Sequence, residues 1–227
     1  MWNEGRGYYY GVLLGDGFYE EHPSNRSPYV MLKAADRDFV EHFAEVVSRL
    51  VGKKYAVCAN SRAKGNCRAQ WHCKCYHRPL VQESIEVTRG KTIIPNGVLM
   101  AERAVQIAFL QGLMDSEGWI TCVLKPMGMG YMQLAFAVTA PWAKDVHRLF
   151  ENLGVRATKI HVRNFPDRNG QPRKPLYSFN LHIGDYLSAG LGFNIKRKAD
   201  RLAWCSRILT DYTRNYPRYA DYYKRTG

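Results

Sequence analysis

The apolar positions of the chain alternate between helical spacing and short strand-like runs, with glycine, proline and polar residues between them. A strongly amphipathic helix, for example, opens near Asp36 and stops at Gly52. In the first part of the chain, these patterns predict a helix over 7–16, two strands within 18–33, a helix over 36–52, two strands within 54–75 and a helix over 80–87.

The same order of patterns returns after the turn residues Pro95, Asn96 and Gly97. The second part predicts a helix over 101–115, strands over 119–125 and 132–139, a helix over 142–153, strands over 156–165 and 176–182, and helices over 185–189 and 198–212. Both parts therefore fit the order αββαββα, which is an α+β fold. We expect two similar halves, residues 1–100 and residues 101–227.

Two apolar segments at corresponding places are versions of one another, Tyr9–Gly17 and Leu110–Gly118. Each has glycine at its third position and ends in an acidic residue followed by glycine. Glycine inside a helix costs about 1 kcal/mol relative to alanine, so two matched glycines need a reason. Small residues four apart on one face let two helix backbones approach closely. We therefore expect the two helices to pack together and to bring Asp16 and Glu117 side by side.

Two carboxylates at helix C-termini are electrostatically unfavourable, because those ends already carry partial negative charge. A bound cation relieves this repulsion, and paired carboxylates suit Mg²⁺ or another divalent ion. Asp16 and Glu117 are the candidate ligands, with Gly15 and Ser116 beside them. Such an ion activates water for attack on a phosphodiester and stabilises the leaving oxygen. The alternative is that each motif is only a buried helix ended by glycine.

The two motifs resemble those of the LAGLIDADG homing endonucleases, and the resemblance extends over essentially the whole chain. It implies that each half forms a curved antiparallel sheet, that the two motif helices form the interface, and that Asp16 and Glu117 are catalytic metal ligands. In the first motif Leu14 replaces an acid that is often found there, whereas the second motif keeps Asp115.

The family also uses basic residues near the cleavage centre. By position, these correspond to Lys196 and Lys91, with Lys33 a weaker candidate. For each of these lysines, a simple phosphate contact is the alternative.

The charge balance agrees with a nucleic-acid partner. The 227 residues include 33 Lys and Arg against 20 Asp and Glu, a formal charge of +13, and basic domains of this kind usually bind polyanions. The resemblance implies that strand residues of each sheet enter the DNA major groove. The candidate DNA-binding residues are Lys33, Arg62, Lys64, Arg68, Gln70, His72, Lys74, Lys125, Lys159, His161, Arg163, Arg168, Arg173 and Lys174. A solvated outer face is the alternative for each of them.

The resemblance implies a monomer that cuts double-stranded DNA at a long target and leaves 3′ overhangs, in the context of a mobile intron. Because the strands of the halves differ, we expect an asymmetric target. One alternative is a maturase that binds intron RNA on the same scaffold without cleavage, and another is a DNA-binding regulator without catalysis.

Six cysteines raise the question of a disulfide or a metal. Four of them (Cys58, Cys67, Cys73 and Cys75) fall on one expected hairpin, but the single residue between the last two is unlike zinc knuckles. Ordinary burial is therefore favoured over a structural Zn²⁺. The sequence shows no signal peptide and no membrane-length apolar run, so we expect an intracellular protein of the cytoplasm or nucleoid that is not secreted and does not bind membranes.

Overall fold

A computed structural model describes residues 2–21, 27–61, 69–123, 131–166, 171 and 173–215. The chain divides into two units, residues 1–117 and residues 118–227. Each unit contains one four-stranded antiparallel sheet and several helices, which confirms the predicted α+β class. In the sequence repeat, the second motif helix is the first element of the second half. In the structure, this helix, which ends at Glu117, belongs to the first compact unit.

The first unit follows the predicted order of helices and strands, with one addition. Its elements are α1 (Glu4–Leu14), β1 (Phe18–Glu20), β2 (Tyr29–Ala34), α2 (Arg37–Val51), β3 (Val57–Ser61), β4 (Gln70–Cys75), α3 (Arg78–Thr88), α4 (Asn96–Leu99) and α5 (Arg103–Glu117). The addition is α4, a single helical turn where the sequence predicted only a turn. Gly52, in the left-handed conformation, ends α2 as expected.

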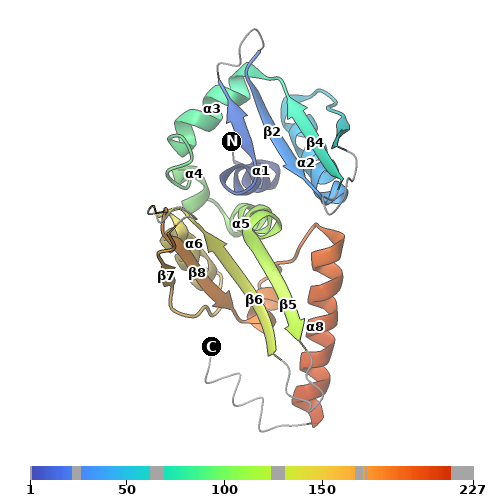
Figure 1. Ribbon diagram of the computed structural model, residues 1–227, viewed down its shortest axis with the longest axis vertical. Coiled ribbons are helices and arrows are strands. Elements are labelled where there is room, and N and C mark those ends of the chain that lie inside the picture. Colours follow the sequence, from blue (N-terminus) through green and yellow to red (C-terminus); the bar gives the residue numbers. More distant parts are fainter. Residues whose placement is uncertain are drawn as a thin grey trace. The chain divides into compact units, whose positions relative to one another are not determined.

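The first sheet has the strand order β1-β2-β4-β3 (Figure 1). Leu32 pairs with Cys73 and Val30 with Cys75, and all four side chains are buried beneath the helices α2 and α3. Side chains alternate along a strand, so the intervening residues point to the opposite face. We call this opposite side the open face of the sheet.

The second unit repeats this architecture with different strand lengths. Its elements are β5 (Gly118–Val123), β6 (Tyr131–Val138), α6 (Ala143–Asn152), β7 (His161–Arg163), β8 (Leu176–Leu181), α7 (Ile183–Ser188) and α8 (Lys196–Asn215). The strand order is β5-β6-β8-β7. The residues Leu134, Phe136, Phe179 and Leu181 form the covered face, and their neighbours in sequence form the second open face.

Strand β7 is much shorter than the predicted strand 156–165, and the reason lies in the hydrogen bonds around Thr158. The backbone N–H of Asn180 donates to the side-chain Oγ1 of Thr158 at 3.0 Å, which replaces a regular ladder bond. Two residues earlier, the backbone N–H of Arg156 donates to a carboxylate oxygen of Asp185 at 3.1 Å. Side chains therefore satisfy backbone groups that a continuous strand would have paired.

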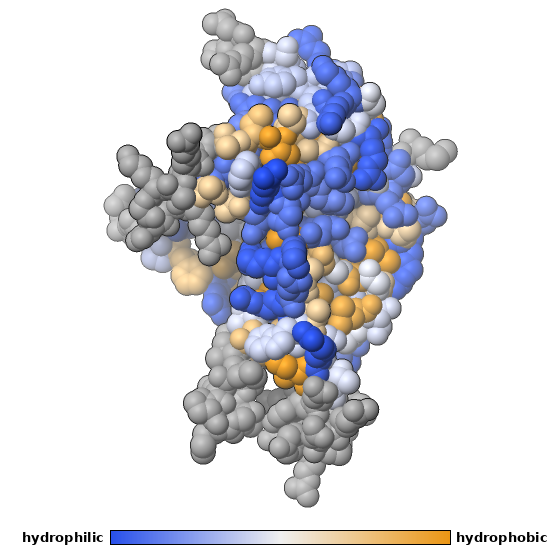
Figure 2. All heavy atoms as spheres, turned by 90° about the vertical axis from the view of Figure 1, so that its right-hand side faces the viewer, coloured by the Kyte–Doolittle hydropathy of each residue, from blue (hydrophilic) through white to orange (hydrophobic). Residues whose placement is uncertain are grey.

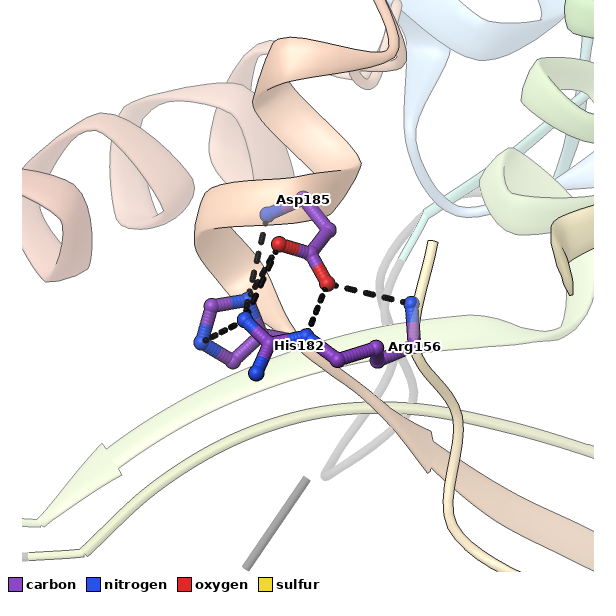
Figure 3. A network of polar contacts seen from close by, with 3 residues as sticks. All are labelled: Arg156, His182 and Asp185. Carbon is purple, nitrogen blue, oxygen red and sulfur yellow. Dashed lines mark hydrogen bonds and ion pairs between the residues drawn. The ribbon is translucent and has the colours of Figure 1, made fainter. Parts of the chain in front are cut away.

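Arg156, His182 and Asp185 form a polar network at the start of α7 (Figure 3). The Nε of Arg156 donates to Asp185 Oδ2 at 2.6 Å, and the backbone N–H of Asp185 donates to His182 Nδ1 at 3.2 Å. The hydrogen bond from Arg156 lowers the pKa of the Asp185 carboxyl to about 2. The network thus fastens α7 to the segment that follows α6.

The surface in Figure 2 is covered mostly by hydrophilic residues, with hydrophobic residues in smaller separate areas. None of the described helices combines the length and the apolar composition that crossing a membrane requires.

Helices α1 and α5 pack side by side through their glycines (Figure 1). A methyl group added to Gly11 would come within 3.0 Å of the Phe109 carbonyl oxygen, and one added to Gly112 would meet the Tyr8 carbonyl equally closely. Gly7, which the sequence analysis did not single out, is just as close to Val105. The obstacles are backbone atoms, so the two helices have no room for a side chain at these positions.

Replacing Gly11 by alanine is expected to destabilise the protein by about 3 kcal/mol, because the added methyl group forces the helix backbones apart. The matched control is Gly5→Ala in the same helix, where the nearest atom lies 3.4 Å from the added carbon. This control should be neutral or stabilising by about 0.5 to 1 kcal/mol. Urea unfolding measures both, and equal effects of the two substitutions would contradict close helix packing.

Replacing Asp185 by asparagine is expected to destabilise the protein by about 1 to 2 kcal/mol at pH 7, because charged hydrogen bonds to Arg156 are lost. The folded carboxyl has a lowered pKa, so its contribution is complete above its unfolded pKa of about 4 and disappears as the pH falls through about 2. Unfolding free energies measured from pH 7 to pH 2 should therefore converge for the two proteins. Asp200→Asn, in an exposed helical ion pair, should change little.

Candidate active site and nucleic-acid interface

The C-terminal ends of α1 and α5 meet directly. A methyl group on Gly15, the residue that caps α1, would fall within 3.0 Å of the Ser116 side chain and 3.3 Å from Cγ of Glu117. Asp16 follows Gly15 and is exposed, and Glu117 is half-buried at the last position of α5. The fold therefore brings the two predicted acidic ends together within the first unit.

The two helix ends combine three sources of negative potential. These are the carboxylate of Asp16, the carboxylate of Glu117 and the partial negative charge at the C-terminal ends of the two helices. The hydroxyl of Ser116 donates to the Gly112 carbonyl oxygen at 3.1 Å, which is a hydrogen bond within α5. A group of oxygen donors of this kind is suited to a hard divalent cation that keeps part of its water shell.

Lys91 reaches this site from the loop after α3. Its Nζ donates to the carbonyl oxygens of Gly15 at 3.1 Å and Gly17 at 2.8 Å, the two residues that flank Asp16. Burial lowers the pKa of Lys91, and the carboxylates of Glu117 and Asp16 oppose that effect. The amine is therefore close enough to interact electrostatically with both acids.

The loop that carries Lys91 adopts a strained backbone. Arg89, Gly90 and Lys91 have φ angles of 44°, 67° and 66°, all in the left-handed region. For a residue with a side chain this conformation costs about 1 to 2 kcal/mol. The backbone N–H of Lys91 donates to Thr88 Oγ1 at 3.1 Å, which helps to hold the loop. Such strain is found where the surrounding structure fixes a residue for function.

In the second unit, the structure points to Lys198 instead of the predicted Lys196. Lys196 is exposed and pairs with Asp200 at 2.8 Å. The Nζ of Lys198 donates to the Gly118 carbonyl oxygen at 2.7 Å, and its side chain is buried. Lys91 and Lys198 therefore play equivalent parts, because each binds the carbonyl of the glycine that follows a motif acid.

The sequence did contain a signal for Lys198. Ile195, Lys198, Leu202 and Cys205 are all buried and follow helical spacing, so the lysine lies on the apolar stripe of α8. Lys196 lies outside this stripe, and its side chain is exposed.

Behind the site, Asp115 is buried inside the helix pair. The hydroxyl of Tyr8 donates to Asp115 Oδ2 at 2.9 Å, and the Tyr8 ring lies edge-on to His42 with the centroids 4.6 Å apart. Burial lowers the pKa of His42, and Asp115 opposes this effect. Asp115 thus connects α5 to α1 and supports the helix ends from within.

The open face of the first sheet carries basic and aromatic side chains. Lys33 pairs with His72 in register, and Gln70 and Lys74 share their face. The Nζ of Lys74 lies 4.5 Å above the ring of Tyr29. The Nδ1 of His72 is buried and has no hydrogen-bond partner among the described residues. The four predicted residues of this sheet that are described therefore line one surface.

The open face of the second sheet is different in character. His161 and Arg163 occupy it as predicted and are exposed, while Lys159, Arg173 and Lys174 are exposed next to the strands. Alternation also places four uncharged polar residues there that the sequence analysis missed, Thr121, Gln133, Ser178 and Asn180. The remaining candidates, Arg62, Lys64, Arg68, Lys125 and Arg168, lie outside the described residues.

The cysteines of the first sheet lie on both of its sides. Cys73 and Cys75 are buried on the covered face, whereas Cys58 pairs with His72 and is exposed on the open face. Within the described ranges, which leave out Cys67, no group of three or more metal-binding side chains comes together. Strand alternation therefore separates the described cysteines of the suggested zinc site.

Neither a protein-family model nor a curated protein sequence matches the chain. Solved structures of homing endonucleases are similar to it. I-DmoI in complex with DNA and Mn is 20% identical, with a TM-score of 0.52 over 82% of this chain and 93% of that chain. I-WcaI bound to its DNA recognition sequence is 12% identical, with a TM-score of 0.54 over 88% and 85% of the two chains.

A variant of I-SmaMI is 10% identical, with a TM-score of 0.53 over 100% of this chain and 97% of that chain. The chain therefore has the fold of the LAGLIDADG homing endonucleases, which is the resemblance that its two motifs indicate.

Replacing Lys91 by methionine is expected to destabilise the protein by about 2 kcal/mol, because two backbone carbonyls lose a charged hydrogen-bond donor. The control is Lys33→Met, whose side chain is exposed on the open face and should change the stability by less than about 0.5 kcal/mol. Urea unfolding distinguishes the two. A loss no larger for Lys91→Met than for Lys33→Met would show that these hydrogen bonds contribute little to folding.

Proposed function

We propose that this protein belongs to the LAGLIDADG homing endonucleases and cuts double-stranded DNA at a specific site. The observation that carries the proposal is the junction of α1 and α5, where Gly15 lies against Ser116 and Glu117 and the amine of Lys91 donates to the two carbonyls that flank Asp16. A protein that only bound nucleic acid would have no need of two acids at this electrostatically unfavourable place. The fold and the basic composition support the same function.

Asp16 and Glu117 would hold Mg²⁺ or another divalent cation, with backbone oxygens of Gly15 and Ser116 beside them. Structures of I-DmoI with DNA include complexes with Mn, Ca and Mg, which supports a divalent ion at this place in the fold. When bound, such an ion supplies an activated water and stabilises the leaving 3′ oxygen of the phosphodiester.

Lys91 and Lys198 would hold the chain at each acid. Each amine binds the carbonyl of the glycine after a motif acid, which fixes the backbone from which the carboxylate projects. Their positive charge also reduces the repulsion between the helix end and the acid. In this proposal, Lys198 takes the role that the sequence gave to Lys196.

The open faces of the two sheets would contact the DNA major groove, which accepts a curved antiparallel sheet. The first face carries Lys33, His72 and Lys74, and the second carries His161 and Arg163 together with uncharged polar groups. Two different faces on one chain fit a long asymmetric target bound by a monomer. A staggered cut with 3′ overhangs, an intron context and an intracellular location complete the proposal.

The test is cleavage of a randomised DNA duplex library in the presence of Mg²⁺. Asp16→Asn and Glu117→Gln should each lower the cleavage rate about 100-fold or more, since each removes charge that stabilises the reacting centre. Lys91→Met and Lys198→Met should also slow cleavage. Lys196→Met is the matched control and should leave the rate almost unchanged, because its amine pairs with Asp200 in solvent.

Cleavage that survives both acid substitutions would place the active site elsewhere. Absence of cleavage by the wild-type protein, combined with tight binding of intron RNA, would instead identify a maturase on the same scaffold.

A further inference from the structure

The open face of the second sheet carries a pair of amide side chains that hydrogen-bond to each other. The Nε2 of Gln133 on β6 donates to Oδ1 of Asn180 on β8 at 2.8 Å. Asn180 pairs in register with Ala135, two residues along from Gln133, so the amides are diagonal neighbours on one face. Both side chains are half-buried.

The backbone of Asn180 is fixed independently of this pair. Its N–H donates to Thr158 Oγ1 at 3.0 Å, and its carbonyl oxygen accepts from the Thr158 N–H at 2.9 Å. The acceptor of the amide pair therefore has a defined position. Because one N–H of Gln133 points at this acceptor, the orientation of the Gln133 amide is restricted.

This hydrogen bond leaves Gln133 with one N–H donor and the Oε1 acceptor. In the described part of the chain neither group has a hydrogen-bond partner. A donor beside an acceptor in one plane is the complement of the adenine edge in the major groove, which presents the N7 acceptor beside the N6 donor. Guanine presents two acceptors there and matches such an amide less well.

The residues around the Gln133–Asn180 pair favour contact with a base edge over contact with a phosphate. The residues directly opposite the amides are uncharged: Thr121 pairs with Gln133, and the buried Ala135 pairs with Asn180. The large neighbour on this face is Trp119, which is also uncharged and pairs with Ala135. Phosphate contacts come most often from charged or backbone donors, whereas base edges are read by groups with a fixed donor and acceptor pattern.

We propose that Gln133 is a specificity-determining residue that reads an adenine of the target, and that Asn180 is the positioning residue that orients its amide. This inference rests on the proposed function, because it requires the second open face to lie in the DNA groove. It adds the identity of one base and the residue that reads it.

The test begins by selecting the preferred sequence of the wild-type protein from a randomised duplex library, with EDTA present to prevent cleavage. Binding to every single-base variant of that sequence is then compared for the wild type and three substitutions. Gln133→Ala should reduce a preference for adenine at one position by about 10-fold or more and leave the other positions unchanged. Asn180→Ala should weaken the preference at the same position.

Gln133→Glu provides a second measurement that does not depend on the loss of a contact. A carboxylate only accepts hydrogen bonds, and in the major groove it matches the N4 donor of cytosine. The preference at that position should therefore change from adenine to cytosine. Thermal unfolding of each variant checks that the fold is retained.

The outcomes separate the inference from the proposed function. If the wild-type protein selects no DNA sequence, the proposed sequence-specific function and the inference are both wrong. If it selects one and Gln133→Ala and Gln133→Glu leave all base preferences unchanged, the sequence-specific function stands and the inference is wrong. The same holds if the affected position is not an adenine.

Discussion

The close approach of α1 to α5 is the constraint on which the rest of the structure depends. Glycines along the contact remove the side chains that would otherwise keep the helix backbones apart, and the obstacle at each one is a carbonyl or amide group of the other helix. This leaves almost no freedom in the relative position of the helices. The direct result is that Gly15 lies against Ser116 and Glu117, so two motifs far apart in sequence end at one place.

The same constraint creates an electrostatic cost that the fold has to compensate. Two helix C-termini and two acids concentrate negative potential, and no part of folding itself requires this. The compensation comes from lysine amines that bind backbone carbonyls next to the acids, and Lys91 does so from a left-handed backbone. A fold that accepts repulsion and backbone strain together at one place is best explained by the chemistry of that place.

Much of this arrangement could be predicted from the sequence, because it depends on local periodicity. Glycines at helical spacing predicted the contact between the motif helices, and strand alternation predicted that Gln70, His72 and Lys74 share a face. The features that were missed depend on interactions that are distant in sequence. The shortening of β7 requires Thr158 to meet Asn180, and the site of Lys91 requires three left-handed residues that no local pattern marks.

Lys198 is an intermediate case, since its burial follows from the helical spacing of Ile195, Leu202 and Cys205, but its partner, the Gly118 carbonyl, is known only from the fold.

The two open faces differ in the side chains that they present. The first face carries two charged amines, those of Lys33 and Lys74, and the imidazole ring of His72. Burial lowers the pKa of His72, so at neutral pH its ring is an uncharged donor and acceptor. Lysines on an open sheet face favour polyanions through an electrostatic interaction that weakens as salt increases. The second face also carries the cation Arg163, next to amides and hydroxyls that release no counterions. Their value lies in discrimination between bases, which depends on fixed hydrogen-bond geometry. Each open face therefore combines cations with uncharged polar groups, in different proportions.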